Sequence, residues 1–194
     1  SGALSESERK IAEEIFRLMV RDAEVRVREA LAQNLKQSPG VPHEVALALA
    51  KDVDSVAEPI LKFSEVLTDA DLVEIIRTQS PAKLVAVASR PRVSENVSSA
   101  LVDTNNEAAV QTLVANKGAA ISETSLHKVV ETFGAKEEIQ AAMIGRPKLP
   151  MTVAERLMTV VSEKIRADLV KRHDLAPELA ASLLLSSREL AVLG

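Results

Sequence analysis

The ten residues LTDADLVEII, numbered 67 to 76, contain the pattern that decides the fold. Thr68 and Asp71 have the spacing of a capping box, which satisfies free backbone N–H groups at the start of a helix. Leu67 and Leu72 have the spacing of a hydrophobic staple, which fixes how the chain enters a helix. The eighth and ninth residues after Leu67 are apolar, and such spacing is typical of a one-sided helix. The segment is therefore predicted to be a short amphipathic helix.

This segment occurs six times along the chain. Its copies begin at Val41, Leu67, Val93, Ile121, Leu149 and Leu175 and are 26 to 28 residues apart. A second apolar segment recurs between them, beginning at Val27, Val56, Leu84, Val110, Ile139 and Ile165. Self-similarity at a fixed period is typical of arrays in which each repeat packs only on its neighbours. Each unit is therefore predicted to be a pair of short helices.

Two similar stretches, SRPRVS at 89–94 and GRPKLP at 145–150, occupy the same place in two units. Each is the turn from the first helix of a pair into the second. Proline ends the first helix, and the apolar residue after the second basic residue is the staple of the next helix. The run LVAVAS at 84–89 would suit a strand by composition, but its place in the repeat predicts a helix.

The two ends of the chain lie outside this period. The stretch SESERKIAEEIFRLMV is predicted to be a cap helix, residues 5–21, with Ser5 and Glu8 as a capping box and one apolar face. That face is expected to contain Ile11, Ile15, Leu18 and Met19. Residues 1–4 are interpreted as a tag remnant or a disordered end, and residues 22–185 as the repeat array. Residues 186–194 are interpreted as the start of a further helix in a longer chain, because the stretch SSRELAVLG ends in apolar residues.

Composition excludes several classes of protein. The chain has 24 Lys and Arg against 28 Asp and Glu, and a net charge of −4 gives no general attraction to nucleic acid or to an anionic membrane. It has no cysteine, so it has no disulfide and no thiolate chemistry, which fits a reducing cytoplasm. No apolar run approaches the ~20 residues of a membrane span. We therefore expect a cytoplasmic protein without a membrane segment.

Motifs for catalysis are absent from the sequence. There is no glycine-rich phosphate loop and no G-x-S-x-G motif. The three histidines, His43, His127 and His173, lie in different units, and no histidine or cysteine stands three or four residues from any of them. These observations predict a protein without enzymatic activity, metal or cofactor.

Basic residues recur near the end of the first helix of each unit. They are Lys36, Lys62, Arg90, Lys117, Arg146 and Arg172, with Arg92, Lys148 and Lys171 nearby. One interpretation is that these cations only complement the helix dipole. The other is a binding edge for an acidic protein segment or phosphates, because arginine-rich ridges recognise such groups. The binding interpretation assigns the partner contacts to Arg90, Arg92, Lys117, Arg146, Lys148 and Arg172.

The succession PGVPHEVALALAKD, VAEPIL, SEVLTDADLVEII, VASRPRVSENVSSALV and LVANKGAAISE resembles an uncharacterised alphaproteobacterial family of HEAT-like repeat proteins, a domain of unknown function. The resemblance covers roughly residues 22–185. It implies a cytoplasmic helical array in the front half of a longer protein, and it brings no catalytic residues. The expected fold is all-α: a right-handed α-solenoid of about six short HEAT-like helical pairs behind a cap helix.

A solenoid offers a long surface for an extended or helical partner segment. We therefore expect a non-enzymatic protein-binding scaffold or adaptor, regulatory in role, with a protein partner. Two alternatives stay open: a HEAT-like protein that binds nucleic acid through the basic residues, and a phosphorelay component that uses His127 or His173. A homodimer also stays open, because the acidic cap helix could meet the basic edge of another copy.

Overall fold

The computed structural model describes residues 5–22, 24–78 and 80–160, and all secondary structure elements in them are helices. The eleven helices of this part are α1 (Glu6–Asp22), α2 (Val25–Leu35), α3 (His43–Ala50), α4 (Asp54–Phe63), α5 (Asp69–Thr78), α6 (Pro81–Ala88), α7 (Glu95–Asp103), α8 (Glu107–Ala115), α9 (Glu123–Phe133), α10 (Glu137–Ile144) and α11 (Met151–Met158). The prediction of an all-helical chain is confirmed for these residues. None of these helices is long and apolar enough to cross a membrane.

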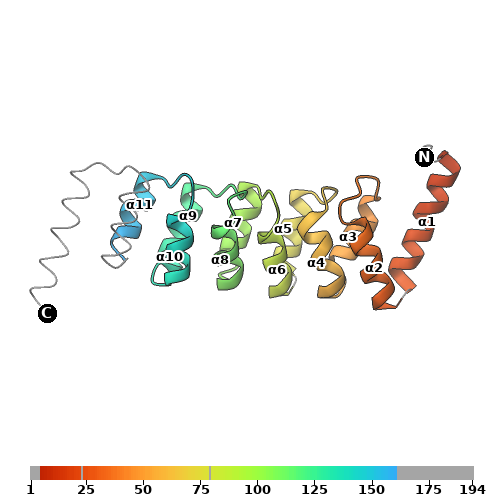
Figure 1. The fold of residues 1–194 in the computed structure, drawn as a ribbon, viewed down its shortest axis with the longest axis horizontal. Coiled ribbons are helices and arrows are strands. Elements are labelled where there is room, and N and C mark those ends of the chain that lie inside the picture. Colours follow the sequence, from red (N-terminus) through yellow and green to blue (C-terminus); the bar gives the residue numbers. More distant parts are fainter. Residues whose placement is uncertain (1–4, 23, 79, 161–194) are drawn as a thin grey trace, which may run out of the picture.

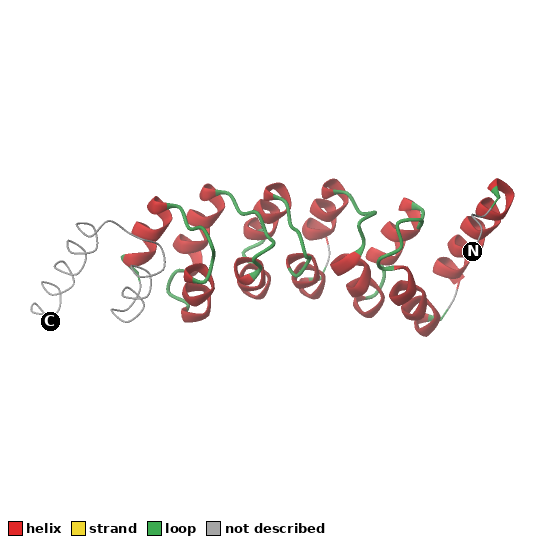
Figure 2. Cartoon of the chain, turned by 45° about the horizontal axis from the view of Figure 1, so that its top comes forward, coloured by secondary structure: helices red, strands yellow, loops and turns green. Residues whose placement is uncertain are grey.

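The helices form two rows. Each even-numbered helix from α2 to α10 packs against the next even-numbered one, and we call this set the even row. The helices α5, α7, α9 and α11 pack in succession in the same way, and α1 packs on α3; we call these helices the odd row. Figure 1 shows the two rows side by side along an elongated molecule, with α1 at one end. Figure 2 shows the loops that lead from each even helix to the next odd helix, one beside the other along the rows.

Local sequence signals explain where the helices begin. Ser94 and Ser122 are N-caps whose side chains accept hydrogen bonds from the backbone N–H groups of Val97 and Ser125. The capping box of Thr68 and Asp71 is also confirmed, since each side chain accepts a bond from the other residue's backbone. The run LVAVAS lies largely inside α6, so its predicted helical state is confirmed.

Small aliphatic side chains fill the space between the rows. The apolar pairs eight and nine residues after each opening residue are at most 3% exposed, namely Leu49 and Ala50, Ile75 and Ile76, Leu101 and Val102, Val129 and Val130, and Leu157 and Met158. They form one continuous core with the buried residues of the even row. The predicted helix stripe is therefore confirmed in five units, and the sixth, with residues 161–194, lies outside the described part.

The stretch predicted to be a cap helix forms α1, and its predicted capping box of Ser5 and Glu8 is confirmed. Of the four residues predicted on its apolar face, only Met19 packs against the core. Ile11, Ile15 and Leu18 are 59%, 50% and 56% exposed, while Met19 packs against the core beside Phe16 and Val20. The reason is that α1 has apolar residues on two sides, and periodicity alone does not tell which side meets the core.

Candidate functional site

The predicted binding residues lie in three neighbouring loops that lead from the even row to the odd row. They are Arg90 and Arg92 in loop 89–94, Lys117 in loop 116–122, and Arg146 and Lys148 in loop 145–150. We call these three loops the basic edge. Arg172, the sixth predicted residue, lies outside the described part of the chain.

Arg90 points into the molecule rather than out of it. Its guanidinium donates to the carbonyl oxygens of Leu61, at 2.5 Å, and Ser64, at 2.7 Å, in the last turn and C-cap of α4. Burial lowers the pKa of Arg90, and the nearby carboxylates of Asp69 and Glu65 oppose this shift. Arg90 therefore acts as a cap for the negative end of the preceding even helix.

Arg146 repeats this arrangement two units later. It donates to the carbonyl oxygens of Val114, Asn116 and Ala119, at 3.0, 3.3 and 2.7 Å. Val114 lies in the last turn of α8, Asn116 is its C-cap, and Ala119 lies in the loop that follows. Burial lowers the pKa of Arg146 as well. The similarity of SRPRVS and GRPKLP is thus explained by one structural task, the capping of the neighbouring unit.

Asn116 performs the same task between them, and sequence reasoning missed it. Its side-chain amide donates to the carbonyl oxygens of Ala88, at 2.9 Å, and Arg90, at 2.7 Å, at the end of α6. The repeat period could have identified Asn116, because this residue lies one unit after Arg90 and so occupies the equivalent turn. Successive units are therefore joined by a chain of side-chain caps.

The other members of the basic edge face solvent. Arg92 is 87% exposed and meets only a distant carboxylate oxygen of Glu65, at 3.5 Å. Lys117 and Lys148 are exposed as well. Surface ion pairs of this kind contribute little to stability, so these three cations are available to a partner.

A shallow groove of about 370 Å³ lies at the α4 end of the basic edge. It is lined by Lys62, Phe63, Glu65, Arg90, Pro91 and Arg92. The Phe63 ring is 37% exposed, and the ammonium of Lys36 lies 5.2 Å from its centroid, a cation–π contact. The groove therefore combines an aromatic surface with free positive charge.

The basic residues before Arg90 do not occupy the loop position that Arg90 has in its unit. Lys62 lies inside α4, where it bonds Glu58 at 2.6 Å, and Lys36 is the C-cap of α2. The loop position equivalent to Arg90 in the preceding unit is Glu65, one residue after the C-cap Ser64. The basic edge therefore consists of the three loops from residue 89 onward.

Two loops of the basic edge are held together by their backbones. Val93 donates to the carbonyl oxygen of Gly118 at 3.3 Å, and Ala120 donates to that of Val93 at 2.8 Å. Gly118 permits this approach, because a β-carbon on it would lie 2.0 Å from the carbonyl oxygen of Pro91. These backbone hydrogen bonds fix the separation of loops 89–94 and 116–122, which carry Arg92 and Lys117.

Gly118→Ala is expected to destabilise the protein by about 1–3 kcal/mol, because the two loops must move apart to admit the methyl group. Gly40→Ala is the matched control, since no atom lies within 4 Å of the added carbon. Urea unfolding monitored by circular dichroism measures both effects. Equal stability of the two variants would contradict the close approach.

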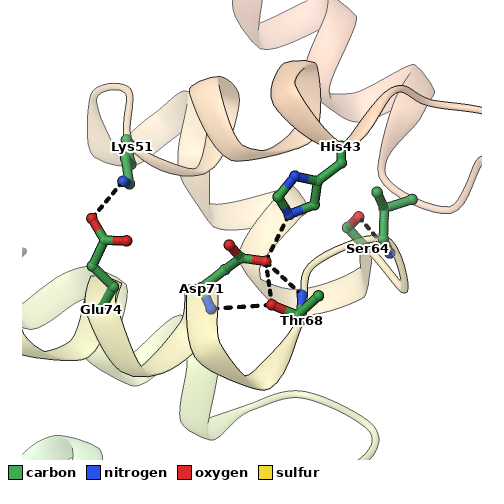
Figure 3. A network of polar contacts seen from close by, with 7 residues as sticks. His43, Lys51, Ser64, Thr68, Asp71 and Glu74 are labelled. Atoms are coloured by element: carbon green, nitrogen blue, oxygen red, sulfur yellow. Dashed lines mark hydrogen bonds and ion pairs between the residues drawn. The ribbon is translucent and has the colours of Figure 1, made fainter.

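A polar network joins α3 to α5 on the odd row (Figure 3). The Nε2 atom of His43 lies 2.8 Å from Oδ2 of Asp71, which also accepts bonds from the backbone and the hydroxyl of Thr68 at 2.8 and 2.6 Å. Lys51 bonds Glu74 at 2.7 Å beside it. Burial raises the pKa of Asp71, but the bonds from His43 and Thr68 outweigh it and leave the pKa below its ordinary value.

Asp71→Ala is expected to cost about 1–2 kcal/mol near pH 7, because it removes the carboxylate half of the capping box of α5 and the contact with His43. The pKa of Asp71 is lowered in the folded state, so its contribution is present above the unfolded value of about 4 and is lost as the pH falls through the folded value. The stability difference between wild type and variant should therefore shrink below about pH 4.

Urea unfolding at a series of pH values tests this expectation. Glu74→Ala is the control, since its exposed pair with Lys51 is expected to contribute less than about 0.5 kcal/mol. A difference between wild type and Asp71→Ala that stays constant down to about pH 3 would show that the carboxylate charge of Asp71 plays no part.

The histidines in the described part of the chain contact hydroxyl and carboxylate side chains. His127 lies 3.2 Å from the hydroxyl of Thr152 and 3.8 Å from Glu123, and His43 contacts Asp71 one unit further along. No group of three or more potential ligands that could hold a metal ion occurs in the described part of the chain. His173 lies outside that part.

The described residues form an all-helical protein with exposed cations on three neighbouring loops. Residues 56–194, which begin in α4 and include the basic edge, match the family model described as an uncharacterised protein conserved in bacteria (DUF2336). The chain belongs to this family. Neither a curated protein nor a solved structure matches it.

Proposed function

We propose that the chain is a right-handed α-solenoid of HEAT-like helical pairs from an alphaproteobacterial cytoplasmic protein, and that it is a non-enzymatic protein-binding scaffold. The neighbour-to-neighbour packing of both rows supports the solenoid. The observation that carries the binding function is that some cations of the basic edge bond the protein's own backbone while others face solvent. Arg90 and Arg146 bond backbone carbonyl oxygens of the neighbouring unit, whereas Arg92, Lys117 and Lys148 are exposed on three consecutive loops. Backbone hydrogen bonds join the first two of these loops, and the Arg146 side chain joins the third to the second.

The spacing of these cations defines the partner. Packed helices lie about 8–10 Å apart, so exposed cations on consecutive loops are separated by about that distance. An extended peptide advances about 3.3 Å per residue, and three residues span about 10 Å. The best partner is therefore an extended acidic segment with a carboxylate at every third residue and an apolar side chain that reaches Phe63.

Fluorescence anisotropy with two labelled peptides tests the proposal. Both have the same composition, but one has Glu at every third position and the other has its Glu residues in one block. We expect the triple variant Arg92→Glu, Lys117→Glu, Lys148→Glu to bind the spaced peptide at least about tenfold more weakly than the wild type, with binding weakened by salt.

The matched control carries the same charge change elsewhere, as Arg26→Glu, Arg77→Glu and Arg156→Glu, three exposed cations on helices. Equal loss of binding in both triple variants would mean that only the net charge of the protein matters. That result would contradict a specific binding site on the basic edge. A single-stranded DNA probe that binds the wild type better than either peptide would favour the nucleic-acid alternative instead.

The solenoid itself predicts how the chain tolerates shortening. Ending the chain at residue 148 removes α11 and everything after it, but leaves the contacts among the earlier helices intact. We expect a folded shorter array whose urea m value falls in proportion to the buried surface that is lost. Complete loss of the helical circular dichroism signal would contradict the solenoid.

A further inference from the structure

Phe63 differs from the other aromatic side chains of the protein. The sequence has three phenylalanines and neither tryptophan nor tyrosine. Phe133 is buried and Phe16 packs against the core, whereas Phe63, the last residue of α4, is 37% exposed. An exposed phenylalanine ring is a large apolar surface whose burial by a partner is favourable. Of the three rings, Phe63 is therefore the one that a partner can reach.

A cation from the neighbouring even helix holds the Phe63 ring. The ammonium of Lys36, the C-cap of α2, lies 5.2 Å from the ring centroid. The same ammonium bonds Oε1 of Gln33 at 3.0 Å, so it is tied to α2. A cation over an aromatic ring is attracted by its π electrons, and this contact favours one orientation of the ring.

Pro91 supplies a second ring to the groove that Phe63 lines. Its neighbour in the sequence, Arg90, bonds the carbonyl oxygens of Leu61 and Ser64, which flank Phe63 along the chain. Loop 89–94 is therefore tied to the end of α4, and both rings belong to a groove of about 370 Å³ that exists without a partner. A preformed site of this kind needs little ordering when it binds.

The charges of the groove favour a neutral side chain inside it. Lys62 bonds Glu58 at 2.6 Å, and Arg90 is committed to the backbone of α4. Glu65 supplies a carboxylate to the lining, 3.5 Å from the guanidinium of Arg92. This carboxylate repels a second carboxylate but accepts a hydrogen bond from an N–H or O–H group. The groove therefore suits a side chain with an apolar body and a donor at its tip.

We propose that the groove binds a tryptophan or tyrosine side chain of the partner segment. Both side chains combine a flat apolar ring with a hydrogen-bond donor, and both are common anchors of protein interfaces. The ring packs against Phe63 and Pro91, and its N–H or O–H donates to Glu65. The inference rests on the proposed function, because it adds an aromatic residue to the acidic segment that binds the basic edge.

The place of the groove puts this aromatic residue at one end of the acidic segment. The groove lies at the α4 end of the basic edge and shares Arg92 with it. The aromatic residue is therefore expected within about three residues of the carboxylate that binds Arg92. A second copy of these 194 residues cannot supply it, because they contain neither tryptophan nor tyrosine.

Two labelled peptides test the choice of side chain by fluorescence anisotropy. Both have Glu at every third position, and they differ only in having tryptophan or leucine at both ends. We expect the tryptophan peptide to bind the wild type at least about threefold more tightly than the leucine peptide. An unlabelled tryptophan peptide should also show a blue shift of its emission on binding, which is read directly because the protein contains no tryptophan.

Phe63→Leu removes the aromatic ring and keeps an apolar side chain. We expect this variant to lose the preference for the tryptophan peptide and to bind the leucine peptide as the wild type does. Met151→Leu is the matched control, since Met151 is 46% exposed on α11, and it should keep the preference. Equal binding of the two peptides to the wild type, or the same preference in Phe63→Leu as in the wild type, overturns the proposal.

N-acetyltryptophanamide tests the groove without the acidic segment, because this probe has no charge to bring it to the basic edge. At millimolar concentration it is expected to shift the NMR signals of Phe63 and Pro91 in the wild type, and those of Pro91 much less in Phe63→Leu. Signals of Phe63 and Pro91 that do not shift overturn the aromatic site. Shifts at both residues, with neither acidic peptide bound, would support the aromatic site and contradict only the acidic partner.

Discussion

Replacing Arg146 with alanine is expected to destabilise the protein by about 2–4 kcal/mol, although the residue was a candidate for partner binding. Its guanidinium bonds three carbonyl oxygens at and beyond the end of α8, and half-buried acceptors that lose a charged donor are costly to leave unpaired. Urea unfolding followed by circular dichroism measures the change.

Lys148 provides the matched control, two residues away in the same loop. Lys148→Ala is expected to change stability by less than about 0.5 kcal/mol, because the side chain is exposed. Arg146→Lys should recover only part of the loss, since one ammonium does not reproduce the planar fork that reaches Val114 and Ala119 together. If Arg146→Ala and Lys148→Ala are equally stable, the capping role is wrong.

The period of the sequence was sufficient to predict the helices and their buried stripes. Leu101 and Val102 stand at the same place in their unit as Ile75 and Ile76, and all four are buried. This works because in a repeated array the same local pattern meets the same neighbours each time. It also explains why LVAVAS forms a helix despite its β-branched residues, since the stacked neighbours of α6 outweigh local preference.

The direction of individual side chains could not be predicted in the same way. Arg90 and Arg92 have the same chemistry and lie in one loop, yet only Arg90 reaches the carbonyl oxygens of α4. The partner of His43 is Asp71, a whole period away, so a search for ligands three or four residues along the helix could not find it. Both cases depend on contacts between units, which appear only when the units are stacked.

Leu101→Ala is expected to have the largest effect on stability, about 3–5 kcal/mol. Leu101 is fully buried in α7, a helix that packs against α5, α8 and α9. Removing three carbons there leaves a cavity, and the surrounding helices cannot close it because neighbours hold them on both sides. Urea unfolding of the purified variant gives the free energy directly.

The comparison with Leu31→Ala tests whether this cost depends on position along the rows. Leu31 is 9% exposed in α2, near the end of the even row, where the structure has fewer neighbours to prevent partial collapse. We expect about 2 kcal/mol there. Equal costs at the two positions would mean that the described helices respond as one compact core. A clearly larger cost for Leu101→Ala would support an array whose stability depends on interfaces between neighbours, since a central helix takes part in two such interfaces and an end helix in one.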